Sequence, residues 1–143
     1  MKSSVADVRI ELLTLCDFAL TSKEGKLSVI GMFDRIFAQK IPTTYARFFV
    51  VAVLTGQSES EHKVSLSIKD PQGNEVLSQA KEIHIKLGSQ GRSNIITDIT
   101  NLPLKVTGEY NVALAIAGKE LGNTHLSVMN VSLQSTSKAT LPN

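Results

Sequence analysis

Apolar and polar residues alternate along most of the chain with a period of two. Residues 62–70 read HKVSLSIKD, so Val64, Leu66 and Ile68 share one side of an extended chain, and serine and lysine residues share the other. The same alternation recurs at residues 81–87, 110–116 and 121–133. This pattern predicts β-strands that each bury one face.

Short turn sequences separate the predicted strands. Residues 70–74 read DPQGN, in which proline presets φ and glycine permits a positive φ. Residues 118–120 (GKE) separate the last two strands, which we therefore expect to form a hairpin. Nowhere do ten or more residues show the 3.6-residue period and the caps of an amphipathic helix.

The N-terminal half is apolar on both sides of its predicted strands. Residues 47–54 read RFFVVAVL and are apolar at even and odd positions alike. Such a run is typical of a central strand that is covered on both faces. Residues 22–25 (SKEG) are a tight connection into another apolar stretch, residues 25–42.

Many short strands separated by turns indicate an all-β protein. We predict an antiparallel two-sheet β-sandwich, immunoglobulin-like or C2-like, with about 8–9 strands and no long helix. Tyr110 enters a strand after a loop, a position at which a tyrosine hydroxyl often anchors a sandwich corner. We assign residues 1–133 to a single domain and residues 134–143 to a polar C-terminal tail.

Composition and charge narrow the expected cellular location and the expected class of binding partner. The 143 residues include 15 basic and 13 acidic ones, and the basic residues are scattered, so we expect no nucleic acid partner. Charges interrupt the only apolar run near the N-terminus, and no window reaches the ~18 apolar residues of a membrane helix. A single cysteine, Cys16, permits no intramolecular disulfide. We therefore expect a cytoplasmic protein that does not associate with membranes.

No catalytic or metal-binding motif stands out. The histidines, which lie in no recognisable motif, are His62, His84 and His125. The Gly-x-Ser-x-Gly nucleophile elbow does not occur, and the two glutamates beside His62 would make a poor ligand set. Cys16 shares the side of its strand with apolar residues, so we expect a buried thiol. We predict no enzymatic activity, no cofactor and no metal.

A charged pair, Asp34-Arg35, interrupts the apolar residues 25–42. On a regular strand the two side chains point to opposite faces and cannot pair with each other. Arg35 falls on the strongly apolar side and needs an acidic partner, for which we expect Asp17 on the preceding strand. Two interpretations stay open: a partly buried Asp17–Arg35 pair that fixes strand register, or an exposed pair on a surface that faces a partner.

The strand at residues 47–54 suggests an interface. A sandwich covers one face of each sheet, so Phe49, Val51 and Val53 would be exposed on the second face unless something covers them. A loop at residues 36–45 could do so, and so could a second chain. Exposed apolar patches mark interfaces.

Several stretches resemble a bacterial family of small single-domain proteins of unknown function. The likeness extends over residues 12–56, with Cys16-Asp17, a Gly25-Lys26-Leu27 turn and Ile30-Gly31 followed by Phe33. It returns at residues 108–122, with Gly108 and Tyr110. The resemblance implies a β-sandwich and a bacterial origin. It implies no activity, ligand or catalytic residue.

Three interpretations of function follow. The first is a non-enzymatic sandwich that binds a protein partner, or a second copy of itself, through the second face of the strand at residues 47–54. The alternative is a small-molecule-binding or enzymatic sandwich with a pocket near Asp17, Asp34 and Arg35. The third is an assembly module that self-associates through edge strands.

Overall fold

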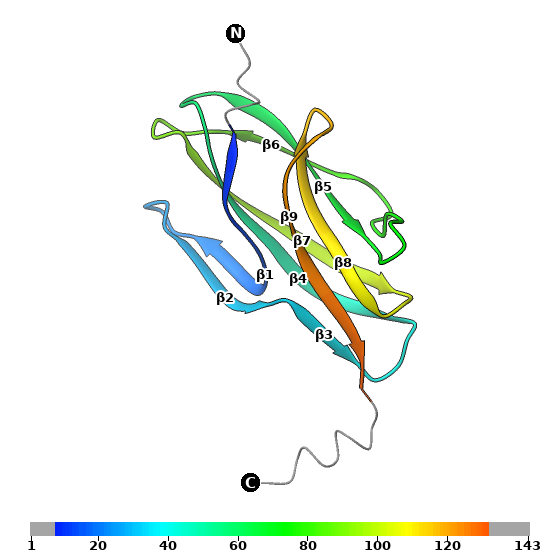
Figure 1. Ribbon diagram of the computed structural model, residues 1–143. Helices are drawn as coiled ribbons and strands as arrows, with labels where there is room; N and C mark the ends of the chain where they lie inside the picture. Colours follow the sequence, from blue (N-terminus) through cyan, green and yellow to red (C-terminus); the bar gives the residue numbers. More distant parts are fainter. Residues whose placement is uncertain (1–7, 132–143) are drawn as a thin grey trace.

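The computed structural model describes residues 8–131, which form two packed β-sheets (Figure 1). The nine strands are β1 (Arg9–Thr21), β2 (Leu27–Phe33), β3 (Arg35–Ala38), β4 (Thr43–Thr55), β5 (Glu61–Lys69), β6 (Lys81–Lys86), β7 (Arg92–Leu104), β8 (Gly108–Ile116) and β9 (Lys119–Asn130). Sheet A has the order β2-β1-β4-β7 and sheet B the order β3-β9-β8-β5-β6. The predicted all-β, two-sheet sandwich is confirmed. The predicted tail at residues 134–143 lies outside the described residues.

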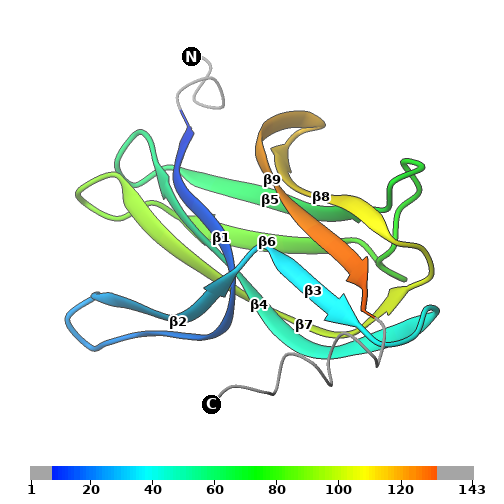
Figure 2. The same ribbon diagram turned by 60° about the horizontal axis from the view of Figure 1, so that its bottom comes forward.

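The strand pairs are antiparallel, as predicted, except at one place. Strand β3 runs parallel to β9, with Arg35 opposite Ser127 and Ala38 opposite Asn130. The chain leaves β2 in sheet A, bends at Asp34 and continues as β3 in sheet B (Figure 2). The Ser127 N–H donates to the Asp34 carbonyl at 2.9 Å, which fixes the bend to β9. Residues 25–42 are therefore two strands in different sheets.

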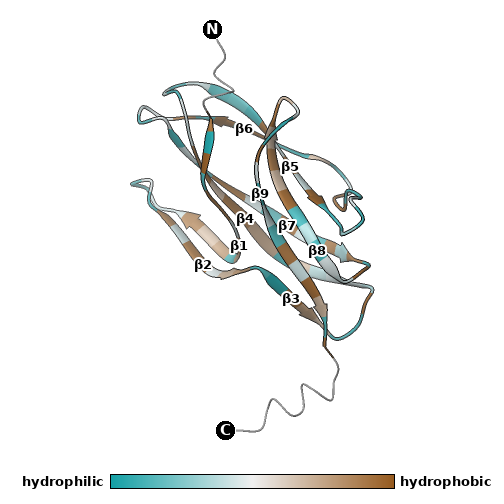
Figure 3. Cartoon of the chain, in the orientation of Figure 1, coloured by the Kyte–Doolittle hydropathy of each residue, from teal (hydrophilic) through white to brown (hydrophobic). Residues whose placement is uncertain are grey.

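The core between the sheets follows the predicted alternation. Val64, Leu66 and Ile68 of β5 are almost fully buried, and the side chains between them are more exposed. Leu126 and Val128 of β9 are likewise buried between more exposed neighbours, on a strand where hydrophobic and hydrophilic residues are mixed (Figure 3). Sheet A contributes alternate residues of β4 to this core, among them Phe48 and Val50. Burial of this surface is the main favourable term in folding.

A tyrosine corner closes the loop before β8, as predicted. The buried Tyr110 side chain donates its hydroxyl to the Val106 carbonyl at 2.7 Å and accepts from the Val106 N–H at 3.4 Å. Burial raises the pKa of Tyr110, so the hydroxyl is neutral and able to donate at ordinary pH. The backbone of this loop is thus hydrogen-bonded to a side chain, in addition to the hydrogen bonds between neighbouring strands.

Among residues 8–131, no helix is long and apolar enough to span a membrane.

We predict that Tyr110→Phe lowers the free energy of unfolding by about 1–2 kcal/mol, because the backbone groups of Val106 lose their partner. Urea denaturation measures the change. Tyr45→Phe is the matched control, since no hydrogen bond of the Tyr45 hydroxyl is found among the described residues. Equal losses in both variants would show that the corner contributes nothing specific.

Candidate functional site

Asp34 and Arg35 lie on the surface and pair with each other. The Arg35 Nε is 3.6 Å from the Asp34 Oδ1, and their side chains are 61% and 79% exposed. The expected buried pair between Asp17 and Arg35 is therefore wrong, and so is the expectation that neighbours in sequence cannot pair here. Both expectations assumed one continuous strand, whereas the chain bends at Asp34 and β3 belongs to the other sheet. An ion pair so exposed contributes little to stability.

Asp17 lies over Gly31 instead. The β1–β2 register pairs Cys16 with Met32 and Phe18 with Ile30, which leaves Asp17 opposite Gly31. Gly31 has a φ of 72°, and a Cβ added there would lie 2.9 Å from the Asp17 Cγ. Only glycine adopts this backbone without strain and leaves room for the carboxylate.

The three charged residues line none of the three pockets that we describe among residues 8–131. Pockets of about 460, 420 and 250 Å³ lie elsewhere. The first lies between residues 76–83 and 99–103, the second beside Gly108 and Met129, and the third beside Tyr110. The expected pocket near Asp17, Asp34 and Arg35 is not found among them.

Phe49, Val51 and Val53 are buried, with exposed fractions of 9%, 0% and 4%. They are therefore covered within the chain, without a second chain. The residues packed with Phe49 and Val51 do not come from the loop at residues 36–45, which was one possible cover. They come mainly from the hairpin formed by the second half of β1 and by β2 (Figure 1).

This hairpin builds a second, smaller core on the outer face of sheet A. β1 pairs with β4 only as far as Cys16, opposite Phe49, and continues beyond that point paired with β2. The buried members of the second core are Cys16, Ala19, Phe49 and Val51, with Leu12, Leu27, Val29 and Ile96 packed against them. Cys16 is fully buried, as predicted, and burial raises the pKa of its thiol.

The Phe18 ring and the ion pair between Arg47 and Asp98 complete the cover over Phe49. Phe18 packs its ring against Phe49 at right angles, with centroids 5.8 Å apart. The Arg47 guanidinium lies 5.2 Å from the centre of the Phe49 ring and donates two hydrogen bonds, of 3.0 and 2.8 Å, to the Asp98 carboxylate. Those hydrogen bonds raise the pKa of Arg47. Bidentate pairing holds the guanidinium plane in place over the ring.

Covering one face of β4 leaves another apolar face exposed. Four large side chains of the hairpin strands are strongly exposed: Phe18 at 46%, Leu20 at 43%, Ile30 at 56% and Met32 at 62%. We call these four residues the hairpin patch. Together they expose a few hundred Å² of apolar surface, the scale of an interaction site on a monomer.

The hairpin patch was missed in the sequence because both sides of the hairpin strands are apolar. Phe18 and Leu20 share their side of β1 with Cys16, so the pattern placed all three in the core. The available signal was Gly31 within an apolar run, which indicates an irregular strand. It could show that the strand bends but not which side becomes exposed.

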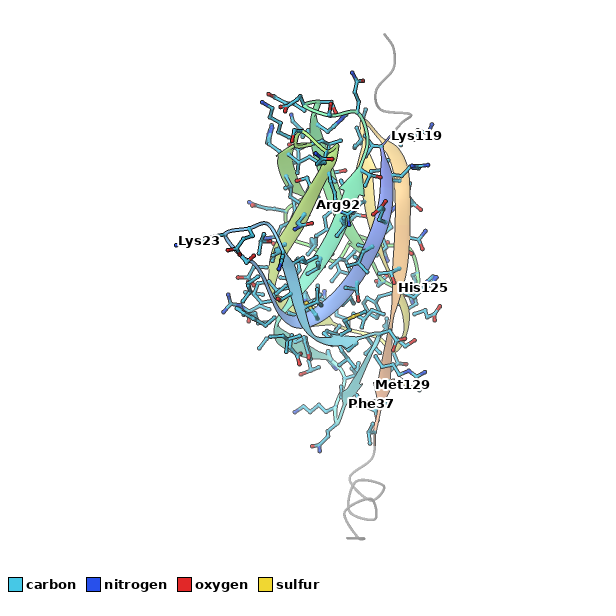
Figure 4. All side chains as sticks on the ribbon, turned by 90° about the vertical axis from the view of Figure 1, so that its left-hand side faces the viewer. Lys23, Phe37, Arg92, Lys119, His125 and Met129 are labelled. Carbon is cyan, nitrogen blue, oxygen red and sulfur yellow. The ribbon has the colours of Figure 1, made fainter. Side chains whose placement is uncertain are left out.

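Two more large apolar side chains are exposed in sheet B, on β3 and β9. Phe37 of β3 lies opposite Met129 of β9, and they are 61% and 44% exposed. Figure 4 shows the two side by side.

The chemistry-bearing residues outside these surfaces form no recognisable catalytic group. Among residues 8–131, no three His, Cys, Asp or Glu side chains lie close enough to share a metal ion. Ser60 Oγ lies 2.8 Å from His62 Nε2 but donates its proton to the Gln57 carbonyl at 2.7 Å. His62 is therefore the donor in this contact, whereas a general base would accept from the serine.

Sequence comparison gives one family. The model of a family of unknown function (DUF6941) matches residues 11–129. No curated protein matches the chain.

Solved structures share the fold. A DNA glycosylase of Pseudomonas fluorescens, AlkC, bound to DNA containing an abasic site analogue, has a TM-score of 0.51 at 14% identity over 86% of this chain. This chain spans only 30% of the length of that enzyme. An immunoglobulin-like protein of Pseudomonas aeruginosa has a TM-score of 0.46 at 18% identity, over 88% of this chain and 99% of that one. A β-glucosidase of Bifidobacterium adolescentis has a TM-score of 0.49 at 12% identity, over 85% and 17%. Identities this low show a shared fold alone.

We predict that Val51→Ala lowers the free energy of unfolding by about 1–3 kcal/mol, because it leaves a cavity in the second core. Ile30→Ala, a comparable truncation on the exposed side of the hairpin, is expected to change it by less than about 0.5 kcal/mol. Thermal or urea unfolding measures both. A neutral Val51→Ala would mean that the hairpin does not cover this face in solution.

We also predict that Gly31→Ala costs about 1–2 kcal/mol of unfolding free energy, because alanine is strained at this positive φ and meets the Asp17 carboxylate. The penalty should be smaller when Asp17→Ala is present, since the carboxylate is then gone while the backbone strain remains. A double-mutant cycle measures this coupling. Strictly additive losses would contradict the contact between the two residues.

Proposed function

The chain belongs to a family of unknown function, DUF6941, which brings no activity with it, and we propose that this member is a non-enzymatic protein-binding module. The observation that carries the proposal is the hairpin patch. Of the large apolar side chains that are strongly exposed in residues 8–131, four of six belong to it. The strand register places Phe18 opposite Ile30, and exposed apolar side chains gathered on one strand pair are suited to docking a protein.

The position of the hairpin patch in the fold supports a role in binding. The inner side of the same hairpin is fixed to sheet A by the second core. Phe18 also packs directly against the buried Phe49. The patch is therefore held in shape before a partner arrives, which lowers the entropic cost of association.

The chemistry of the patch favours a protein partner over a nucleic acid. The four side chains are uncharged, and the nearby lysines, Lys23 and Lys26, lie at the hairpin turn together with Glu24. Phosphate contacts would need a concentration of basic side chains. The fold shared with the DNA-bound AlkC therefore does not by itself favour DNA as a ligand here.

The alternative, a small-molecule or enzymatic site at Asp17, Asp34 and Arg35, has little support. The Asp34–Arg35 pair is exposed, and Asp17 lies over Gly31. Neither arrangement encloses a substrate or places a nucleophile beside a base.

We predict that Met32→Glu abolishes capture of the partner from a native lysate, because it places a charge within the apolar hairpin patch. Phe37→Glu is the matched control, since Phe37 is exposed to 61% and Met32 to 62% and both lie on edge strands. Both variants should unfold at the temperature of the unsubstituted protein. Bound proteins are identified by mass spectrometry after pull-down.

Loss of the partner in Phe37→Glu but not in Met32→Glu would move the interface to the β3–β9 edge. Loss in neither variant would remove the hairpin patch as the binding surface.

A further inference from the structure

The four edge strands of the sandwich differ in how they are protected against pairing. β7 includes Arg92, Asp98 and Pro103, and β6 includes Lys81, Glu82 and Lys86. β3 has only four residues and begins with Arg35. Charges, proline and short length are the usual devices that block an exposed sheet edge. β2, with the seven residues LSVIGMF, contains no charge and no proline.

The backbone edge of β2 that faces away from β1 is available for pairing with another strand. Within residues 8–131, β2 pairs only with β1. β2 lies on the left-hand side of the molecule in Figure 1, and Figure 4 looks from that side onto the hairpin, with Lys23 at its tip. Every second residue of an edge strand directs its backbone N–H and C=O away from the sheet.

We propose that β2 pairs with β2 of a second copy of this chain, antiparallel and about a two-fold axis. This inference rests on the proposed function and names its partner. An axis at Ile30 gives the fullest overlap, because all seven residues then have a partner and Leu27 lies opposite Phe33 of the second copy. Such an interface is isologous, since the same strand serves both copies.

The charges at the two ends of β2 select this arrangement. In the register centred on Ile30, Lys26 of each copy lies opposite Asp34 of the other. Lys26 directly precedes β2 and Asp34 directly follows it, so the opposite charges flank the apolar residues at both ends of the paired strands. The Asp34 side chain is 79% exposed, and its contact with Arg35 at 3.6 Å lies on the surface. A shift of the register by one residue would instead place Lys26 opposite Arg35, and like charges directly opposite are unfavourable.

The same register suits the side chains between the charges. Ile30 meets Ile30 of the second copy on the axis, and Met32 meets Ser28. Gly31 lies opposite Val29. Cross-strand pairs of this kind are the unit of sheet stabilisation. The interface is only one strand wide, at the small end of specific contacts, so we expect a dimer that dissociates on dilution.

The test is sedimentation of the full chain from low micromolar to near-millimolar concentration. The unsubstituted protein should change from monomer to dimer. Ile30→Lys should remove the dimer, because it places two like charges on the axis, and Phe37→Lys should leave it unchanged. Both variants are first checked for an unaltered fold by circular dichroism and thermal unfolding.

Charge reversal tests the register. Lys26→Glu and Asp34→Lys should each weaken the dimer about tenfold at low salt, because two pairs per dimer become repulsive. The double variant should restore the affinity to within about twofold, since the opposite charges face each other again. A purely local role for either residue would not produce this rescue.

Several outcomes would overturn the proposal. These are a monomer at every concentration, a dimer that survives Ile30→Lys, a dimer that Phe37→Lys disrupts, or charge reversals without rescue. If the protein stays monomeric while Met32→Glu still abolishes capture from a lysate, then the hairpin patch binds a different protein. In that case the proposed function stands and the second copy is excluded as its partner.

Discussion

The structure depends on one strand that is apolar on both faces. β4 is buried continuously from Phe48 to Leu54, so each face of sheet A needs an apolar cover. Sheet B covers one face through the main core, and the β1–β2 hairpin covers the other through the second core. The two-layered sandwich thus gains part of a third layer without any helix among residues 8–131. The hairpin can only do this because β1 parts from β4 after Cys16.

The change of sheet at Asp34 follows from the same arrangement. β2 is occupied with β1 at the outer side of sheet A, so the chain crosses to sheet B and adds β3 beside β9. The backbone hydrogen bond from Ser127 to Asp34 holds the crossing. A charged residue at this bend stays in water, which explains why Asp34-Arg35 interrupts an otherwise apolar stretch. The pair marks the place where one strand becomes two.

Local pattern was sufficient for much of the fold and for little of the site. The alternation of β5, the buried thiol of Cys16 and the corner at Tyr110 depend on neighbours in sequence or on a recurring backbone geometry, and all three were predicted. The Asp17–Arg35 pair failed because parity was carried across a bend. The cover of Phe49 and Val51 could not be located from the pattern, because it comes from a segment some thirty residues away in the chain. Where both parities of a strand are apolar, as in β1, alternation cannot say which side the remainder of the chain will cover.

The hairpin also couples the stability of the second core to the binding of a ligand at the hairpin patch. Ala19 and Val29 of the hairpin close the second core, and exposed side chains of the same two strands form the hairpin patch. Local opening of the hairpin would therefore expose Phe49 and Val51 and dismantle the docking surface in a single event. A ligand that binds only the closed form opposes that opening by mass action, by about 2.7 kcal/mol at a concentration one hundred times its Kd. The protection of the β1 and β2 amides against hydrogen exchange would then report how much of the protein is bound in the cell.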